Sequence, residues 1–161
     1  MYAIDGKHKL LPWSNFLRWE CQRCGFCCEV LQIKLLKEEE KKLREKYGDV
    51  VTYIDGEPFL KRKSDGTCIF LERKDNVAVC TIYEDRPLAC RIYPFYLRRW
   101  RDAKKSELFK EVSKESVVFK YRGRKFVVLV SNFCLGLGKG PPIEYGIQSA
   151  LREKYFKHNE K

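Results

Sequence analysis

The stretch "CQRCGFCC", residues 21–28, holds four of the chain's eight cysteines. Cys21 and Cys24 form a C-x-x-C pair, the separation at which a tight turn can aim two sulfur atoms at one metal. Gly25 directly after this pair can relieve the strain of that turn. Cys27 extends the spacing to C-x-x-C-x-x-C, by which a ferredoxin-like loop holds three corners of a [4Fe–4S] cluster. The stretch therefore indicates a metal site, and it favours iron–sulfur over zinc.

Cys28 directly follows Cys27, and this adjacency constrains the arrangement of the sites. Neighbouring side chains on an extended backbone point to opposite faces, so we expect the two cysteines to serve different sites unless one is not a ligand. Eight cysteines divide into two sets of four, but their spacing does not say which four belong together. Burial as an apolar thiol is the alternative for the isolated cysteines. These are Cys68, Cys80, Cys90 and Cys134.

The composition bears on the compartment and on disulfides. A chain of 161 residues can bury a core without covalent staples. It has no apolar run that could span a membrane and no signal-peptide pattern, so we expect a cytoplasmic protein without a membrane partner. A reducing cytoplasm disfavours disulfides. However, the bias to Lys and Glu with a single Met is thermophile-like, and intracellular proteins of hyperthermophiles can carry disulfides, which keeps a disulfide-stabilised protein as an alternative.

Alternating apolar patterns and turn residues predict a small α+β domain of β-hairpins and a few helices, organised around one or more cysteine-ligated metal sites. The second predicted hairpin carries Cys68 and Cys80 on its two arms, and the third delivers Cys134 just beyond its second arm. The predicted hairpin turns lie at residues 55–56, 74–76 and 122–123.

Helical periodicity and proline positions predict the remaining elements. Residues 29–48 are expected to form a strand followed by a helix that ends at Gly48. Pro87 suits the start of a short helical turn that Pro94 would end. Residues 136–142, "GLGKGPP", are expected to form a loop that lets the backbone approach the metal site.

Two arginines, Arg86 and Arg91, flank Cys90. Guanidinium groups beside a thiolate-rich site would offset its negative charge and could bind an anionic cofactor or substrate. Ion pairs with Glu84 or Asp85 on the same turn are the alternative. The sequence assigns no catalytic residue, so whether the protein is an enzyme stays open.

The formal net charge of +11 reflects 33 Lys and Arg against 22 Asp and Glu. This surplus favours an anionic partner. Residues 97–101 and 120–125 interleave cations with aromatic side chains, a pattern found where proteins bind nucleic acid. Ordinary strand surfaces explain the same pattern, so nucleic acid is a possible partner that the sequence does not favour. The redox partner or substrate is unknown.

Taken together, the pieces "CQRCGFCC", "CIFL", "CTIYEDRPLACRIYPF" and "CLGLGKG" resemble the YkgJ-like cysteine-cluster family, a zinc- or iron-chelating domain. The pieces follow the family order. The resemblance implies metal or iron–sulfur binding by the matching cysteines, but it implies no settled reaction. We expect one domain over residues 1–161, with a family-like core at 21–140 and a C-terminal helix at about 143–158. The matching cysteines are Cys21, Cys24, Cys27, Cys28, Cys68, Cys80, Cys90 and Cys134.

Two hypotheses of function follow. The leading one is a metalloprotein with all-cysteine ligation that holds one or two iron–sulfur clusters, of the [4Fe–4S] type, for redox chemistry or for activating a substrate. The alternative is a structural zinc module whose basic surface binds RNA or a protein complex.

Overall fold

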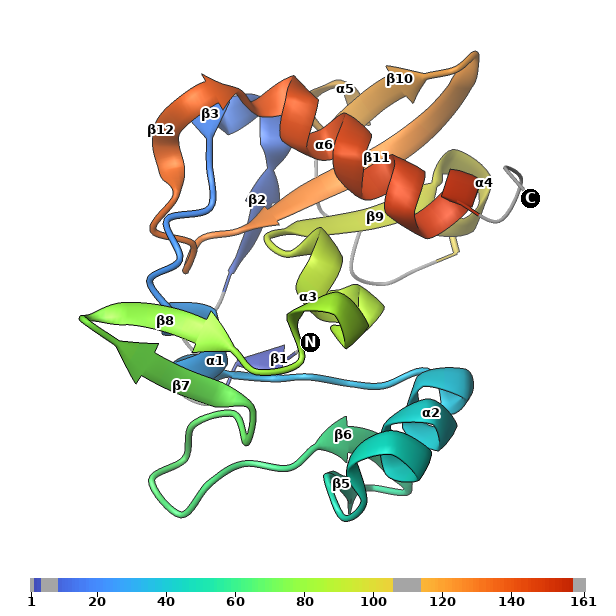
Figure 1. The fold of residues 1–161 in the computed structure, drawn as a ribbon. Helices are drawn as coiled ribbons and strands as arrows, with labels where there is room; N and C mark the ends of the chain where they lie inside the picture. The colour runs from blue at the N-terminus through green and yellow to red at the C-terminus, as the bar shows by residue number, and fades with distance from the viewer. Residues whose placement is uncertain (1, 4–8, 106–113, 158–161) are drawn as a thin grey trace. The chain divides into compact units, whose positions relative to one another are not determined.

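The computed structural model describes residues 2–3, 9–105 and 114–157, which form two compact units (Figure 1). Unit 1 comprises Met1–His8 and Gln22–Arg91, and unit 2 comprises Lys9–Cys21 and Ile92–Lys161. Both helices and antiparallel hairpins are present, so the predicted α+β class is confirmed. The single domain over residues 1–161 stays a prediction. In the described part of the chain, none of the helices has the length and apolar character needed to cross a membrane.

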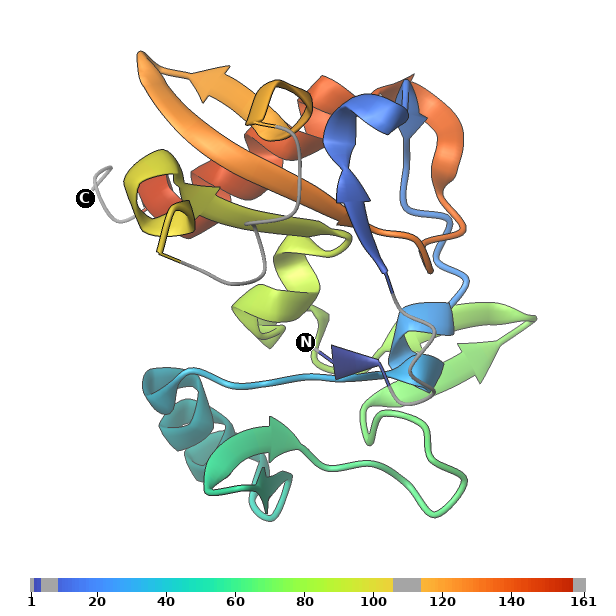
Figure 2. The ribbon, with the colours of Figure 1, turned by 180° about the vertical axis from the view of Figure 1, so that it is seen from behind.

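Strand β11, Arg124–Ser131, is the centre of the sheet in unit 2. Strand β9, Phe95–Arg99, pairs with one edge of β11. The other edge pairs first with β10, Val118–Tyr121, and then with β2, Leu10–Pro12. All three pairings are antiparallel, and Figures 1 and 2 show the strands from the two sides. The apolar run of β11 is therefore buried between neighbours on both edges.

Helix α6, Ile143–Leu151, covers one face of this sheet and continues as a π-helical turn to Phe156. The alternation of a strand sends Phe126, Val128 and Val130 of β11 to the α6 face. The intervening side chains face a second cluster, to which α4 (Trp100–Ala103) and α5 (Lys114–Val117) contribute. Trp13 of η1 (Trp13–Asn15) packs against the cluster on the α6 side. The predicted C-terminal helix is thus confirmed up to Phe156, and the end predicted near residue 158 lies outside the described residues.

The predicted loop "GLGKGPP" was wrong, because residues Leu137–Pro142 form strand β12. This strand pairs with β3, Arg18–Trp19, through an irregular register. The glycines permit the irregularity, since Gly138 and Gly140 both have positive φ. Gly136 does allow a close approach of backbone, but the neighbour is Glu20, whereas we expected the metal site. A Cβ at position 136 would lie 2.0 Å from the Glu20 carbonyl oxygen.

The predicted hairpins are confirmed at all three sites. In each, both central turn residues have positive φ, as a two-residue type I′ turn requires. Cys80 ends the second arm of the hairpin β7–β8 as expected. Cys68 precedes the first arm and bridges to Arg62 instead. The hairpins of unit 1 are β5 (Val51–Ile54) with β6 (Glu57–Leu60), and β7 (Leu71–Lys74) with β8 (Val77–Cys80).

Residues 29–48 form the predicted helix but a shorter strand than expected. Helix α1, Phe26–Val30, extends past Glu29, and only Leu31–Gln32 form a strand, β4, which pairs with β1, Tyr2–Ala3. Helix α2, Lys37–Tyr47, ends at Gly48 as predicted.

Glu39 in the first turn of α2 links the start of this helix to α3, Leu88–Ile92, which follows the short helix η2, Tyr83–Asp85. Its carboxylate accepts the backbone N–H groups of Leu36, at 3.0 Å, and of Leu88, at 2.7 Å. The helical turn predicted after Pro87 is therefore confirmed and fixed to α2.

Replacing Ile147 by Ala should destabilise unit 2, because this side chain is fully buried between α6 and the sheet. We expect the free energy of unfolding to fall by about 2–5 kcal/mol, as for other buried large-to-small changes. Tyr145→Ala on the exposed side of α6 is the matched control and should change it by less than about 0.5 kcal/mol. Urea denaturation followed by circular dichroism measures both, and equal losses would contradict the packing described.

Candidate metal centre

The segment that carries the cysteine cluster is held against the hairpin β7–β8. Gly25 adopts φ +74° at the start of α1, and a Cβ there would lie 2.6 Å from the Ala78 Cβ. The Ala78 N–H donates to the Arg23 carbonyl at 3.1 Å. Arg73 donates to the Cys24 carbonyl at 3.3 Å and also forms an ion pair with Glu29. The glycine after the C-x-x-C pair thus allows a close approach that a side chain would prevent.

Arg62 closes the other end of α1. Its guanidinium donates to the carbonyl oxygens of Glu29 at 2.5 Å, Leu31 at 2.6 Å and Cys28 at 3.3 Å. The Cys28 carbonyl also accepts the Cys68 N–H at 2.8 Å. Arg62 therefore satisfies helix-end carbonyls that would otherwise lack partners, and it keeps Cys28 next to Cys68. The sequence analysis did not identify Arg62, because it lies between Lys61 and Lys63 and no sequence feature distinguishes it from these neighbours.

Four thiols of unit 1 lie near enough for their charges to interact. In addition to burial, the charges of the other three thiols raise the pKa of Cys90. The charge of Cys28 also raises the pKa of Cys68 and of Cys80, again in addition to burial. Each thiol comes from a different part of the unit: α1, the segment before β7, the end of β8, and α3. The structure thus gathers Cys28 with three cysteines that are isolated in the sequence. The four are Cys28, Cys68, Cys80 and Cys90.

Backbone hydrogen bonds reach two of these sulfur atoms. The N–H of Phe70 donates to the Cys68 thiol, and the N–H of Ile82 donates to the Cys80 thiol. In both cases the donor is two residues beyond the cysteine. Hydrogen bonds of this kind stabilise the thiolate form, which is the form that binds a metal.

The pKa values of the four thiols differ in direction. A hydrogen bond from Cys27 lowers the pKa of Cys28 to about 7, against the effect of burial and aided by the positive charge of Arg62. Burial raises the pKa of Cys68 and Cys80, and it raises that of Cys90 well above its ordinary value, with the neighbouring thiolate charges adding to the increase. A metal must therefore displace protons from at least three of these thiols, which makes its binding dependent on pH.

The contact between Cys27 and Cys28 corrects one expectation. We expected an extended backbone that points the two side chains to opposite faces, but both residues lie in helix α1. Adjacent side chains on a helix are only about 100° apart, so the Cys27 thiol can hydrogen-bond to Cys28. Adjacency alone thus does not separate them, and their division between two sites stays a prediction.

Two predicted ligands, Cys21 and Cys134, belong to unit 2. The Trp19 indole N–H donates to the Cys134 sulfur at 3.2 Å, and the Glu20 N–H donates to the Gly136 carbonyl at 3.1 Å. Cys21 follows directly and is exposed. That all eight cysteines are ligands therefore remains a prediction. Within unit 1 the structure brings Cys28 close to Cys68, Cys80 and Cys90, and Cys27 hydrogen-bonds to Cys28.

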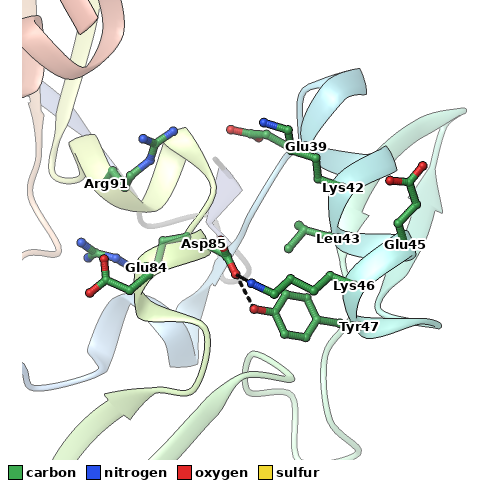
Figure 3. A pocket seen from close by; sticks show the side chains of 10 residues that line it. Glu39, Lys42, Leu43, Glu45, Lys46, Tyr47, Glu84, Asp85 and Arg91 are labelled. Atoms are coloured by element: carbon green, nitrogen blue, oxygen red, sulfur yellow. Dashed lines mark hydrogen bonds and ion pairs between the residues drawn. The ribbon is translucent and has the colours of Figure 1, made fainter.

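Arg86 and Arg91 line a pocket of about 500 Å³ between α2 and the segment η2–α3 (Figure 3). The Arg86 guanidinium lies 3.8 Å from the centre of the Tyr83 ring, and its charge lowers the pKa of the Cys80 and Cys90 thiols against their burial. It is therefore close to both the pocket and the thiols. Its role in binding a cofactor, like that of Arg91, stays a prediction.

Asp85 on the same pocket wall pairs across to α2. Its carboxylate accepts hydrogen bonds from Lys46 and from the Tyr47 hydroxyl, each at 2.5 Å, as Figure 3 shows. These contacts lower the pKa of Asp85. Asp85, one of the two acids proposed as ion-pair partners of Arg86 and Arg91, is therefore hydrogen-bonded to α2.

The donor set fits a soft metal, although its arrangement is not a ready-made ion site. All eight cysteines are thiols, and four sulfur donors suit zinc or an iron–sulfur cluster. Among the residues that the structure describes, no three Cys, His, Asp or Glu side chains form a group that could hold a metal ion as they stand. The structure thus shows four thiols near enough for their charges to interact.

Comparison with known families agrees with the donor set. The model of the CxxCxxCC family, described as "Putative zinc- or iron-chelating domain", matches residues 20–119. The chain belongs to this family. The predicted resemblance is thereby confirmed, and membership of the CxxCxxCC family supports metal binding by zinc or iron. The matched residues include the whole cluster at 21–28 and all four gathered thiols, whereas Cys134 lies beyond them.

One similar protein comes from Methanocaldococcus jannaschii and is itself uncharacterised. It is 32% identical over 95 residues, which cover 55% of this chain and 51% of that protein. The match spans about half the length of this relative. No solved structure matches the chain.

Replacing Arg62 by Ala should weaken unit 1, because four carbonyl groups would lose a donor, among them that of Cys28. We expect a loss of about 2–4 kcal/mol in the free energy of unfolding of the metal-free protein, given the strength of charge-assisted hydrogen bonds. Arg62→Lys should recover little, since an ammonium lacks the planar fork. Exposed Lys41→Ala on α2 is the control. If Arg62→Ala were as stable as the control, the stabilising role of the Arg62 hydrogen bonds would be refuted.

The reduced, metal-free protein should show one thiol that reacts early in a pH series. A lowered pKa means that the Cys28 thiolate is present above about pH 7 and is lost as the pH falls through that value. The raised pKa of Cys90 keeps that thiol protonated past pH 9, its ordinary value. Alkylation rates mapped by mass spectrometry from pH 5 to 10 should therefore rise near pH 7 for Cys28 and only later for Cys90. The reverse order would contradict the environments described.

Proposed function

We propose that unit 1 holds a [4Fe–4S] cluster through Cys28, Cys68, Cys80 and Cys90, and that the cluster serves a redox role. The observation that carries the proposal is the gathering of four thiols from separate parts of the unit. The Cys68 N–H donates to the Cys28 carbonyl, Leu71 links Cys68 to Cys80 through backbone pairing, and the Cys90 thiol lies within the range of all three charges. Four thiolates are the standard ligand set of such a cluster. Membership of a family of zinc- or iron-chelating domains supports the same conclusion.

A single zinc ion and a [4Fe–4S] cluster require different separations between four cysteine sulfur atoms. Four sulfurs bound to one zinc, each about 2.3 Å from it, must lie within about 4 Å of one another. In a [4Fe–4S] cluster each cysteine binds its own iron atom, so the sulfurs lie farther apart. The separation of the four sulfur atoms in the loaded protein therefore distinguishes a cluster from a single zinc ion.

The surroundings of the thiols suit a charged cluster. Backbone N–H groups reach Cys68 and Cys80, and the Cys27 thiol reaches Cys28. Two guanidinium groups add positive charge: that of Arg62 lowers the pKa of Cys28, and that of Arg86 lowers the pKa of Cys80 against its burial. Hydrogen bonds to the sulfurs and nearby positive charge stabilise the more reduced, more negative state of a cluster, which raises its reduction potential.

The number of ligands bears on the role. Four cysteine ligands would leave no iron atom of the cluster open to a substrate. Such a cluster is suited to accepting and donating electrons, whereas substrate activation needs an open iron. We therefore favour electron transfer, with a redox partner, over catalysis at the cluster. The second centre predicted from the eight cysteines is not part of this proposal.

Metal and sulfide analysis of protein purified without oxygen tests the proposal. We expect a brown protein with about four irons and four acid-labile sulfides per chain, as the cluster formula requires. The Cys68→Ser and Cys90→Ser variants should each lose most of this iron and sulfide. They should also unfold at a lower temperature than the loaded protein, because ligand binding stabilises the folded state.

The matched control is Cys134→Ser, which removes a thiol of unit 2 beyond the family match. It should retain the iron and sulfide of the unit 1 cluster. Colourless wild-type protein with stoichiometric zinc and no sulfide would refute the cluster and favour the zinc alternative. Loss of iron in the control, with retention in Cys68→Ser, would refute the ligand assignment.

A further inference from the structure

The positive charge of the chain is concentrated in unit 2. Unit 2 contains 18 Lys and Arg against 8 Asp and Glu, whereas unit 1 contains 15 against 14. Of the net charge of +11, +10 thus belongs to unit 2. If the surplus only reflected a thermophile-like surface composition, we would expect it in both units. The asymmetry therefore points to an anionic partner of unit 2 in particular.

The sheet of unit 2 joins the two basic segments that are separate in the sequence. Strand β9 places Arg98 opposite Val127 of β11, and the hairpin β10–β11 places Lys120 directly opposite Lys125. Strand alternation puts all three cations on the sheet face away from α6. Like charges that face each other across a strand pair repel and destabilise the sheet, so this arrangement has no benefit for folding alone.

Aromatic rings lie among these cations. The Arg122 guanidinium is 5.3 Å from the centre of the Tyr121 ring, and the Lys125 amine is 6.0 Å from that of Trp100. Both rings are half-buried, while Lys120, Arg122, Arg124 and Lys125 are exposed. The ion pairs found among the described residues include none of these four cations.

We propose that this end of the sheet binds a single-stranded nucleic acid. The hairpin surface, as we call it, wraps around this end of the sheet: Arg98, Lys120 and Lys125 lie on the face away from α6, and Arg122 and Arg124 lie on the α6 side, 4.9 and 5.7 Å from the centre of the Phe156 ring. Arginine forks bind phosphate oxygens in pairs, and half-buried rings between cations can stack on bases. The sequence alone did not favour this partner, because each basic segment by itself suits an ordinary strand. The convergence of both segments on one end of one sheet is what the structure adds.

An anionic membrane would need a different surface. Peripheral binding to lipid usually combines basic residues with exposed apolar side chains that enter the interface. In the described part of the chain, the large exposed hydrophobic side chains lie elsewhere, and none belongs to the hairpin surface. The surface is therefore suited to phosphates in solution and not to a lipid bilayer.

Fluorescence anisotropy with a labelled oligouridylate of about 20 nucleotides, longer than the site of one small binding module, tests the proposal on the full chain with its metal. The variant changes Lys120, Arg124 and Lys125 to Gln. Each lost phosphate contact lowers the slope of log K against log salt by about 0.7, so the slope should fall by about 2 and the affinity by on the order of 10- to 100-fold at about 0.1 M salt.

The matched control changes three exposed lysines of unit 1, Lys37, Lys41 and Lys74, to Gln. It removes the same charge and should weaken binding less than about threefold, since only long-range attraction is lost. Equal effects of the two triple variants would overturn the hairpin surface. So would binding to phosphatidylserine vesicles without binding to oligouridylate, or competition by inorganic polyphosphate as strong as that by unlabelled oligouridylate. Because the readout is nucleic-acid binding, it is independent of whether the metal is iron or zinc.

Discussion

The Cys28 carbonyl group is the point on which the arrangement of unit 1 depends. It accepts a hydrogen bond from the Cys68 N–H and another from the Arg62 guanidinium, which also binds the carbonyls of Glu29 and Leu31. A short helix of five residues could not hold its own C-terminal end in place. The guanidinium does so from a segment more than thirty residues away. Cys28 is thereby held next to Cys68, and, in addition to burial, its charge raises the pKa of Cys68, Cys80 and Cys90.

The gathered thiols explain why metal binding and folding should be coupled. Burial and mutual repulsion raise the pKa of Cys90, so the unit can keep its thiols close only while most of them are protonated. A metal replaces those protons with a positive charge that all four sulfurs share. The same contacts that favour protonated thiols in the metal-free state therefore favour the metal once it binds.

The elements that sequence reasoning predicted are those with local causes. Turn residues that tolerate positive φ, such as Asp55 and Gly56, mark a hairpin wherever alternating strands flank them. The grouping of Cys28 with Cys68, Cys80 and Cys90 has no local cause, since tertiary contacts such as those of Arg62 determine it. Strand β12 was missed for a similar reason: its glycines and prolines read as a loop, and only pairing with β3 makes it extended.

The two units differ in chemistry as well as in fold, with the gathered thiols in one and almost all of the net positive charge in the other. The central claim concerns the thiols, and protection of cysteines by the bound metal tests it most directly. Protein loaded without oxygen would be alkylated briefly, stripped of metal and mapped by mass spectrometry. We predict that Cys28, Cys68, Cys80 and Cys90 are protected together in the loaded protein, and that removal of the metal makes Cys28 reactive near neutral pH before Cys90. Alkylation of these four in the loaded protein at the rates of the metal-free protein would contradict the account.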